Sequence, residues 1–252
     1  MADLREIVEH MDAYLDVGAI PDAPGARNGL QVDGRSPVER ICAAVDASQE
    51  TIDAAAAEGA QLLLVHHGLF WGDPLPVVGR TYRRLKALFD ADLAVYSCHL
   101  PLDVHPEIGN NVLLARALGL EVEGRFGAWA GYEGVGVWCA ADLPLDALAG
   151  RVTDACGSDP RVIGGGPGHV RRLGIVTGGA GSMISMAHEA GLDTFLTGEG
   201  NHHTYHDATE LGVNVLYAGH YATETPGVKA LGERVASRFD VAWSFIDRPT
   251  GL

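Results

Sequence analysis

The sequence predicts an α/β fold of two similar lobes, each built on a mainly parallel, mixed sheet. Two observations carry this prediction. Short apolar runs alternate with amphipathic segments along the chain, and such strand–helix alternation is typical of parallel sheets. The C-terminal half then repeats the plan of the N-terminal half, and a repeat of this length indicates an ancestral duplication rather than a solenoid.

Three apolar runs in the first half, each bounded by turn residues, predict strands. They span residues 41–46, 61–65 and 93–97. Three further segments have the spacing of helices, and they span residues 47–59, 82–91 and 110–119. Asn110 is expected at the N-cap of the last helix, because an asparagine side chain accepts hydrogen bonds from the first helical N–H groups.

The second half contains three predicted strands and one predicted helix between them. The strands span residues 173–177, 193–197 and 213–217, and the helix spans 183–191. The segment GGAGS at 178–182 joins a strand to a helix and is expected to be a tight turn, with a phosphate-receiving loop as the alternative. The glycine-rich run 162–168 is expected to be a loop.

The two halves match at the ends of their strands. An offset of 132 residues places Val65 on Thr197, and an offset of 121 places His99 on His220 and Asp103 on Glu224. We therefore expect two α/β halves, residues 1–125 and 126–252, that together form one metal-site unit.

Three clusters of histidine and carboxylate residues follow predicted strands. They are His66-His67, His99-x3-Asp103 and His220-x3-Glu224. Parallel sheets bind ligands beyond the carboxyl ends of their strands, so we expect these clusters to share one rim. Imidazole and carboxylate ligands suit divalent Zn, Mn or Fe better than Ca or Mg. A four-residue spacing returns both side chains to one face if a helical turn follows the strand.

The adjacent histidines pose a geometric problem, because neighbouring side chains on a strand point to opposite faces. Both can face one site only if the strand ends there and the backbone turns. Adjacent histidines do not readily chelate one ion, but each can serve one ion of a pair. The pattern therefore favours a site with two divalent metal ions per subunit.

Five segments resemble the motifs of the NIF-three-like family of dinuclear metal-centre proteins, also named GTP cyclohydrolase type-two homologues. In this sequence they read NGLQ at 28–31, VHHGLFW at 65–71, HLPLD at 99–103, TGE at 197–199 and AGHYATE at 218–224. They occur in the family's order over nearly the whole chain. The chain resembles the short form, which lacks an inserted domain, and it departs from the family at Arg27, where Asp is usual.

The resemblance implies metal ligands at five positions and a particular assembly. The implied ligands are His66, His67, Asp103, His220 and Glu224. The resemblance also puts His99 near the site. It implies a two-lobed subunit in a ring-like homohexamer, with the metal sites facing an inner cavity.

These parts suit a metal-dependent hydrolase of a small molecule, in which two ions activate a bridging water. We expect His99, or one of the group His202, His203 and His206, to transfer protons, with His203 preferred within that group. The family name suggests a GTP cyclohydrolase-like reaction on a nucleotide. The alternative is a non-catalytic metal-binding scaffold or adaptor, because no equally clear substrate-recognition motif accompanies the metal ligands.

The charge balance argues against nucleic acid as a partner. The formal net charge is −15, from 33 acidic and 18 basic residues, whereas phosphate binding needs a basic face. No apolar run approaches the roughly 18 residues that a membrane span needs. The four cysteines are far apart in the sequence and suit a reducing compartment, so we expect a cytoplasmic protein.

Overall fold

The computed structural model of the chain describes residues 1–72 and 76–252 and forms two compact units. Unit 1 comprises Met1–Leu102 and Gly227–Arg248, and unit 2 comprises Asp103–Pro226 and Pro249–Leu252. The long helix α9 (His220–Phe239) contributes its first part to unit 2 and its remainder to unit 1. The boundaries of these compact units differ from those of the sequence halves 1–125 and 126–252. That the two halves are domains remains a prediction.

Unit 1 is built on a five-stranded sheet in the order β1-β4-β3-β2-β11. Its strands are β1 (Gly29–Val32), β2 (Arg40–Asp46), β3 (Leu62–His67), β4 (Ala94–Ser97) and β11 (Ala242–Phe245). All neighbours pair in parallel except the edge strand β1, which runs antiparallel to β4. The helices of this unit are α1 (Leu4–Tyr14), α2 (Gln49–Ala57) and α3 (Gly79–Asp90), together with the second part of α9.

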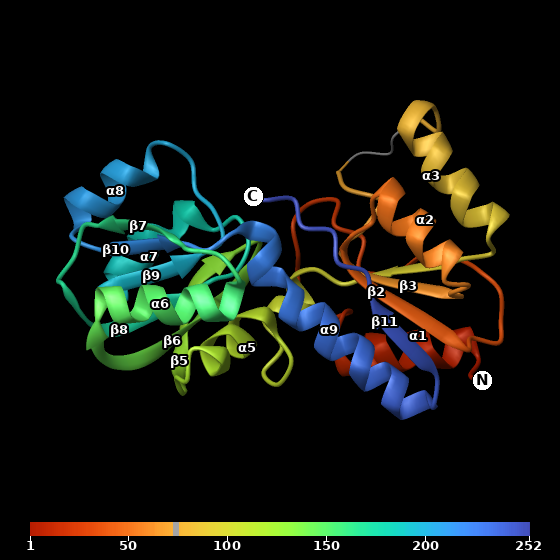
Figure 1. The fold of residues 1–252 in the computed structure, drawn as a ribbon, viewed down its shortest axis with the longest axis horizontal. Helices are drawn as coiled ribbons and strands as arrows, with labels where there is room; N and C mark the ends of the chain where they lie inside the picture. Colours follow the sequence, from red (N-terminus) through yellow and green to blue (C-terminus); the bar gives the residue numbers. More distant parts are fainter. Residues whose placement is uncertain (73–75) are drawn as a thin grey trace. The chain divides into compact units, whose positions relative to one another are not determined.

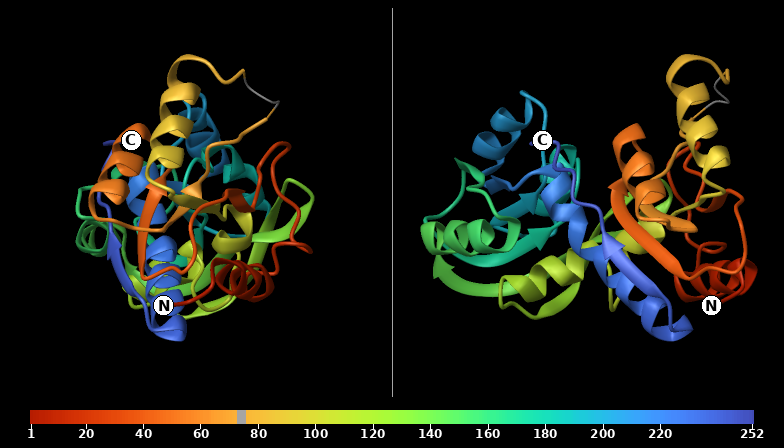
Figure 2. Two further views of the ribbon diagram at one scale, coloured as in Figure 1. Left: turned by 90° about the vertical axis from the view of Figure 1, so that its right-hand side faces the viewer. Right: turned by 45° about the vertical axis from the view of Figure 1, so that its right-hand side comes forward.

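Helices α2 and α3 cover one face of this sheet and α1 lies on the other, as Figures 1 and 2 show. Alternate strand residues such as Leu63 and Val65 are buried against α2 and α3. Helix α2 begins where Ser48 and Thr51 form a capping box, which satisfies N–H groups that the helix itself leaves open. The helices after β2 and β3 therefore return the chain so that these parallel strands end at one edge of the sheet.

Unit 2 is built on a six-stranded sheet in the order β5-β6-β8-β9-β10-β7. Its strands are β5 (Val122–Trp129), β6 (Tyr132–Pro144), β7 (Arg161–Gly164), β8 (His169–Ile175), β9 (Thr194–Thr197) and β10 (Asn214–Tyr217). Its complete helices are α5 (Asn110–Ala117), α6 (Leu145–Cys156), the 3-10 turn η1 (Gly181–Met183), α7 (Ile184–Glu189) and α8 (Thr204–Leu211). Helices α5 and α6 share a buried apolar core with β6 and β8.

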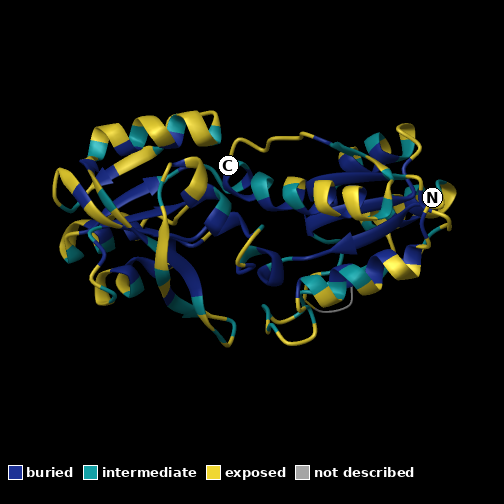
Figure 3. Cartoon of the chain, turned by 90° about the horizontal axis from the view of Figure 1, so that it is seen from below, coloured by how far each residue is buried: buried dark blue, intermediate teal, exposed yellow. Residues whose placement is uncertain are grey.

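The topology confirms the predicted duplication. Each unit contains three parallel strands that alternate with helices along the chain. One more strand comes before these three in the sequence and pairs antiparallel with the third of them. The order β1-β4-β3-β2 in unit 1 thus corresponds to β7-β10-β9-β8 in unit 2. The parallel strands β2, β3, β4, β9 and β10 are mostly buried, as the dark blue strands of Figure 3 show, whereas β5, β7 and β11 are largely exposed or half-buried.

Two local predictions were wrong. The run 162–168 is not a loop throughout, because strand β7 occupies its first part and pairs with β10. Its alternating Val162 and Ile163, exposed and buried respectively, suit an edge strand, and Gly164 is the only glycine of the run that lies within the paired strand. Asn110 is not an N-cap residue either, because Gly109 takes that position and Asn110 is the first residue of α5.

Among the described residues, every helix is too short or too polar to cross a bilayer. This agrees with the absence of a long apolar run from the sequence.

Candidate metal centre

Three histidine rings gather at the carboxyl ends of β3 and β4 in unit 1. The ring centroids of His66 and His67 lie 4.7 Å apart, and that of His99 lies 4.9 Å from His66 and 5.7 Å from His67. One potential ligand atom from each of the three side chains lies within 4.8 Å of the others. This spacing allows the three side chains to hold a metal ion.

The adjacent histidines come together because β3 ends at His67, as the sequence analysis required. By strand alternation, His67 continues the row of Leu63 and Val65, which faces α2 and α3, while His66 continues the opposite row. His66 is fully buried and His67 is partly exposed. The end of the strand therefore brings two rings from opposite faces to one rim.

Each of the three rings is held through its Nδ1 atom by an oxygen acceptor. Nδ1 of His66 lies 2.9 Å from the carbonyl oxygen of Cys98, and Nδ1 of His67 lies 2.9 Å from Oδ1 of Asp46. Nδ1 of His99 lies 2.8 Å from Oδ1 of Asp22. A carbonyl or carboxylate oxygen only accepts, so each Nδ1 carries the hydrogen, and in the neutral ring Nε2 carries the lone pair.

This pattern is the one that metal-binding histidines show, because the acceptor on Nδ1 fixes the tautomer and the ring orientation and raises the basicity of the ligand. Three imidazole rings also match the preference of Zn and similar transition ions for nitrogen ligands. The residues present in unit 1 therefore fit a divalent transition metal.

Two residues of the loop before β1 form hydrogen bonds with His99. Asn28 accepts a hydrogen bond from the backbone N–H of His99 and donates another to Asp22. Oδ2 of Asp22 also accepts from the backbone N–H of Leu100. Burial alone would raise the pKa of Asp22, but hydrogen bonds from His99, Asn28 and the backbone outweigh it and lower that pKa. Asp22 is therefore held as a carboxylate.

A second group of candidate ligands lies in unit 2, where α9 begins. His220 and Glu224 occupy successive turns of the helix, and His220 Nε2 lies 3.2 Å from a carboxylate oxygen of Glu224. On its other side Nδ1 of His220 lies 2.7 Å from Oε1 of Glu199, which follows β9. The hydrogen bond to Glu224, opposed by burial and reinforced by Glu199, raises the pKa of His220 to about 9. The same carboxylates would favour any cation at this ring, including a metal ion.

The glycine loop after β8 packs against this group. Gly178 has a φ of +71°, and a Cβ atom built there would overlap Oε1 of Glu224. The N–H groups of Gly178, Ala180 and Gly181 donate to acceptors within the protein. Because these three groups already have acceptors, the loop is better suited to a tight turn beside Glu224 than to receiving a phosphate.

Asp103 lies in unit 2 at the end of the short helix α4 (Leu100–Asp103), the helical turn predicted to follow the strand. Its Oδ1 accepts a hydrogen bond from Asn110 Nδ2 at 2.8 Å. The neighbouring Asn111 is fully buried and bonds the backbone and hydroxyl of Thr177. The Thr177 hydroxyl in turn lies 3.4 Å from Oδ1 of Asp103. Hydrogen bonds from Asn110 and Thr177 therefore orient this carboxylate.

The three histidines near the start of α8 are arranged differently. His202 and His203 are exposed, and the His202 ring packs edge-on against His206 at 5.9 Å. His203 occupies the N-cap position of α8 without a capping hydrogen bond from its side chain. Its role in catalysis stays a prediction.

Sequence reasoning missed the carboxylates that orient the rings. A signal for Asp46 was present, because this residue ends a predicted strand and His67 follows the next predicted strand by two residues. In the structure the two are register partners. Glu199 belongs to one of the quoted motifs, but its partner was not evident. No comparable signal marked Asp22, which reaches His99 from a loop 77 residues away in the chain.

Comparison with known proteins adds a family context. The family model Duf34/NIF3 (NGG1p interacting factor 3) matches residues 2–250. A GTP cyclohydrolase 1 type 2 homolog of Deinococcus radiodurans is 46% identical over 98% of this chain and 94% of its own length. A protein of the same name from Pseudomonas aeruginosa is 45% identical over 98% of this chain and 97% of its own.

Solved structures resemble the whole chain as well. Protein ybgI, described as of unknown function, superposes with a TM-score of 0.92 at 38% identity over 99% of this chain and 100% of its own. TTHA1606 from Thermus thermophilus has a TM-score of 0.89 at 43% identity, with the same coverage. The fold is therefore shared with these proteins from end to end.

Proposed function

Because the chain belongs to the Duf34/NIF3 family, we propose that it is a metal-dependent hydrolase of a small molecule that binds two divalent metal ions per subunit. The observation that carries the proposal is the arrangement of His66 and His67, in which each Nδ1 is bound to an oxygen acceptor and each Nε2 carries the lone pair. Such tautomer control is expected of metal ligands.

We propose five metal ligands, which are those that the resemblance of the motifs implies. The proposed ligands are His66, His67, Asp103, His220 and Glu224. Support comes from each unit by itself: unit 1 supplies clustered imidazoles, and unit 2 supplies a histidine and carboxylates whose positions are fixed by hydrogen bonds. Carboxylates can bridge ions, so one of Asp103 and Glu224 would serve both ions of the pair.

Divalent ions in such a centre would lower the pKa of a bound water and polarise a carbonyl or phosphoryl oxygen of the substrate. The protein's own task is to move protons. His99 is suited to it, because Asp22 holds its Nδ1 hydrogen and would stabilise the ring when it gains a second proton. His203, exposed at the start of α8, is the second proposed proton-transfer residue.

A nucleotide is the substrate that we propose to test first, because the similar proteins bear the name GTP cyclohydrolase 1 type 2 homolog. We also propose a homohexamer, on the resemblance of the five motifs alone. Light scattering after size-exclusion chromatography tests the oligomeric state directly.

The functional test is a turnover assay of the purified chain supplied in turn with Mn, Fe or Zn. The panel contains nucleotides, phosphoesters and peptides, and formate release is monitored for the nucleotides. We expect Glu224→Ala to abolish turnover, whereas Glu210→Ala, an exposed glutamate on α8, should leave it unchanged. Absence of turnover on the whole panel by metal-loaded protein would contradict the proposal.

The second candidate is a metal-binding scaffold or adaptor without catalytic activity. It is favoured by one observation, the family description itself, which names an interacting factor. Under this alternative Glu224→Ala would lose metal but keep partner binding. The two functions thus differ in whether any substrate is turned over by the unmodified chain.

A further inference from the structure

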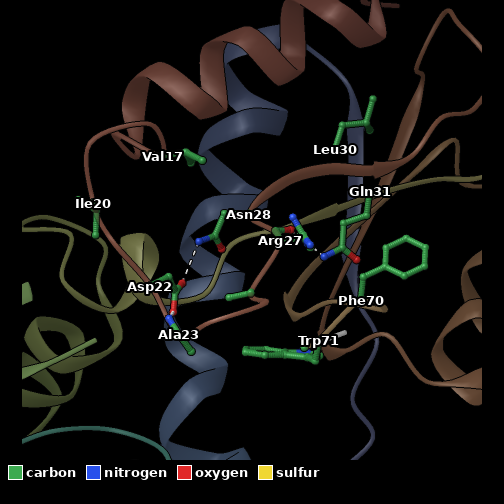
Figure 4. A pocket seen from close by; sticks show the side chains of 12 residues that line it. Val17, Ile20, Asp22, Ala23, Arg27, Asn28, Leu30, Gln31, Phe70 and Trp71 are labelled. Carbon is green, nitrogen blue, oxygen red and sulfur yellow. Dashed lines mark hydrogen bonds between the residues drawn. The ribbon is translucent and has the colours of Figure 1, made fainter. Parts of the chain in front are cut away.

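A cavity of about 690 Å³ lies within unit 1 beside the three histidines. Its volume falls within the range of roughly 300–1,000 Å³ that small-molecule sites occupy. The lining residues that matter for recognition are Asp22, Arg27, Asn28, Gln31, Phe70 and Trp71 (Figure 4). The cavity therefore has the size and mixed lining of a ligand site.

Three residues that line the cavity also contact His99. Asp22 and Asn28 both bond His99, and the indole of Trp71 meets the His99 ring edge-on at a centroid distance of 4.9 Å. The indole also lies 6.0 Å from the ring of His67. A molecule bound in the cavity would consequently lie next to the residues proposed to bind metal.

Trp71 offers an aromatic surface to the cavity. It keeps 37% of its surface exposed, and Figure 4 shows the indole edge-on along one border of the pocket, with Phe70 on another. Its contacts with His99 and His67 hold the ring in place. An exposed, pre-oriented indole is a good stacking surface for a planar ring.

The polar side chains of the lining differ in how far they are already used. Both carboxylate oxygens of Asp22 accept hydrogen bonds from protein donors, and Asn28 uses both its oxygen and its nitrogen. Gln31 accepts from the backbone of Leu69 and donates to the carbonyl of Arg27. These three side chains form part of the cavity wall, and most of their hydrogen-bonding groups already have partners within the protein.

Arg27 is the exception. Its guanidinium is exposed, is the only cationic group among the described lining residues, and makes no ion pair or hydrogen bond with any residue that the structure describes. In a chain of net charge −15, such a cation at a cavity attracts an anion. Guanidinium groups bind phosphate and carboxylate with two parallel hydrogen bonds.

We propose that this cavity binds the substrate as a planar heteroaromatic ring that carries a phosphate or carboxylate group. Trp71 stacks on the ring, and Arg27 pairs with the anionic group. The inference rests on the proposed function, since it assigns the cavity to the substrate of that site. It adds the place where such a substrate binds and two recognition residues, neither of which is a proposed metal ligand.

The test is binding of three probes to the purified full chain by isothermal titration calorimetry. The probes are a nucleoside monophosphate, the corresponding nucleoside and inorganic phosphate. We expect the monophosphate to bind most tightly. Arg27→Gln should weaken it about tenfold or more without changing nucleoside binding, and Trp71→Ala should weaken both ring-bearing probes by a similar factor.

Matched controls lie elsewhere in the chain. Arg35→Gln removes another exposed arginine of unit 1, and Trp129→Ala removes a tryptophan with a similar exposed fraction of 41%. Neither should affect binding. Equal affinities of the wild-type chain and Arg27→Gln for the monophosphate would overturn the proposal, as would the absence of binding of both ring-bearing probes at millimolar concentration.

Failure of the cavity assignment can be distinguished from failure of the proposed function. If the chain hydrolyses some other compound and holds metal, but binds no aromatic anion, only the assignment of the cavity is wrong. If the probes bind as predicted but no compound is turned over, the cavity stands as a ligand site and the hydrolase proposal fails.

Discussion

His67 and Asp46 are register partners at the ends of the parallel strands β3 and β2, and Nδ1 of His67 donates a hydrogen bond to Oδ1 of Asp46 at 2.9 Å. Both residues follow rows of core residues that face α2 and α3. The strand register therefore places an orienting carboxylate beside a candidate metal ligand. This relationship makes Asp46 the simplest position at which to test whether His67 binds metal.

Asp46→Ala should lower the affinity for Zn by about 10- to 100-fold, because outer carboxylates fix the tautomer and orientation of the histidine ligand. The affinity is measured by competition with a chromophoric chelator. Asp53→Ala removes an exposed carboxylate from α2 and serves as the matched control. Equal affinities of the two variants would show that Asp46 does not support a metal ligand.

Gly178→Ala should impair metal binding in unit 2. The new Cβ atom would overlap the Glu224 carboxylate, so Glu224 or the loop must move. Gly157→Ala is a fair control, because Gly157 also has a positive φ (+78°) but has open space around it. Both variants incur the strain of a left-handed residue, about 1 kcal/mol, but only Gly178→Ala should lose metal. Thermal denaturation and metal analysis of both variants separate the two effects.

Asn111→Ala should destabilise the protein by about 2–4 kcal/mol, as measured by urea unfolding. The buried side chain bonds the backbone N–H and hydroxyl of Thr177 and the carbonyl of Val135, and alanine leaves these groups without their partner. Asn111→Asp keeps the acceptor for Thr177 but loses the donor to Val135. A loss below about 0.5 kcal/mol for the alanine variant would mean that water replaces the network.

Burial raises the pKa of Cys42, Cys139 and Cys156 to about 11. The thiolate is the reactive form, so at pH 8 these thiols should react with iodoacetamide about 100-fold more slowly than in the unfolded chain. Their reactivity should rise about tenfold per pH unit up to pH 11, for as long as the protein stays folded. Peptide mapping by mass spectrometry, in buffer and in urea, measures each site. Rapid labelling of Cys42 at pH 8 in the folded protein would contradict the prediction.

Much of the fold could be predicted because hydrophobic periodicity and strand-end chemistry are local properties of the sequence. The strands around His66 and before His99, and the turn that sets His220 against Glu224, follow from runs of a few residues. The edge strand β7 was missed because its four residues lead into a glycine-rich run, and its pairing with β10 comes from tertiary structure.

The candidate site was predictable only in part for the same physical reason. Ligand types and spacing are visible in the sequence, but the groups that orient the ligands come from remote segments. Asp22 reaches His99 from a loop without secondary structure of its own, and Asn110 turned out to bind Asp103 rather than to cap its helix. The cavity beside Trp71 likewise depends on a loop near Arg27 that periodicity does not specify.

The central claim is that these histidines and carboxylates bind divalent metal. The most direct measurement is elemental analysis of chain purified without chelators or affinity-tag metal, normalised to chain concentration, beside Glu224→Ala and the control Glu210→Ala. We predict about two ions per chain in the wild type and the control, and a clear fall in Glu224→Ala. A ratio near zero that added Mn, Fe or Zn does not raise would contradict the account and leave the histidines with a structural role.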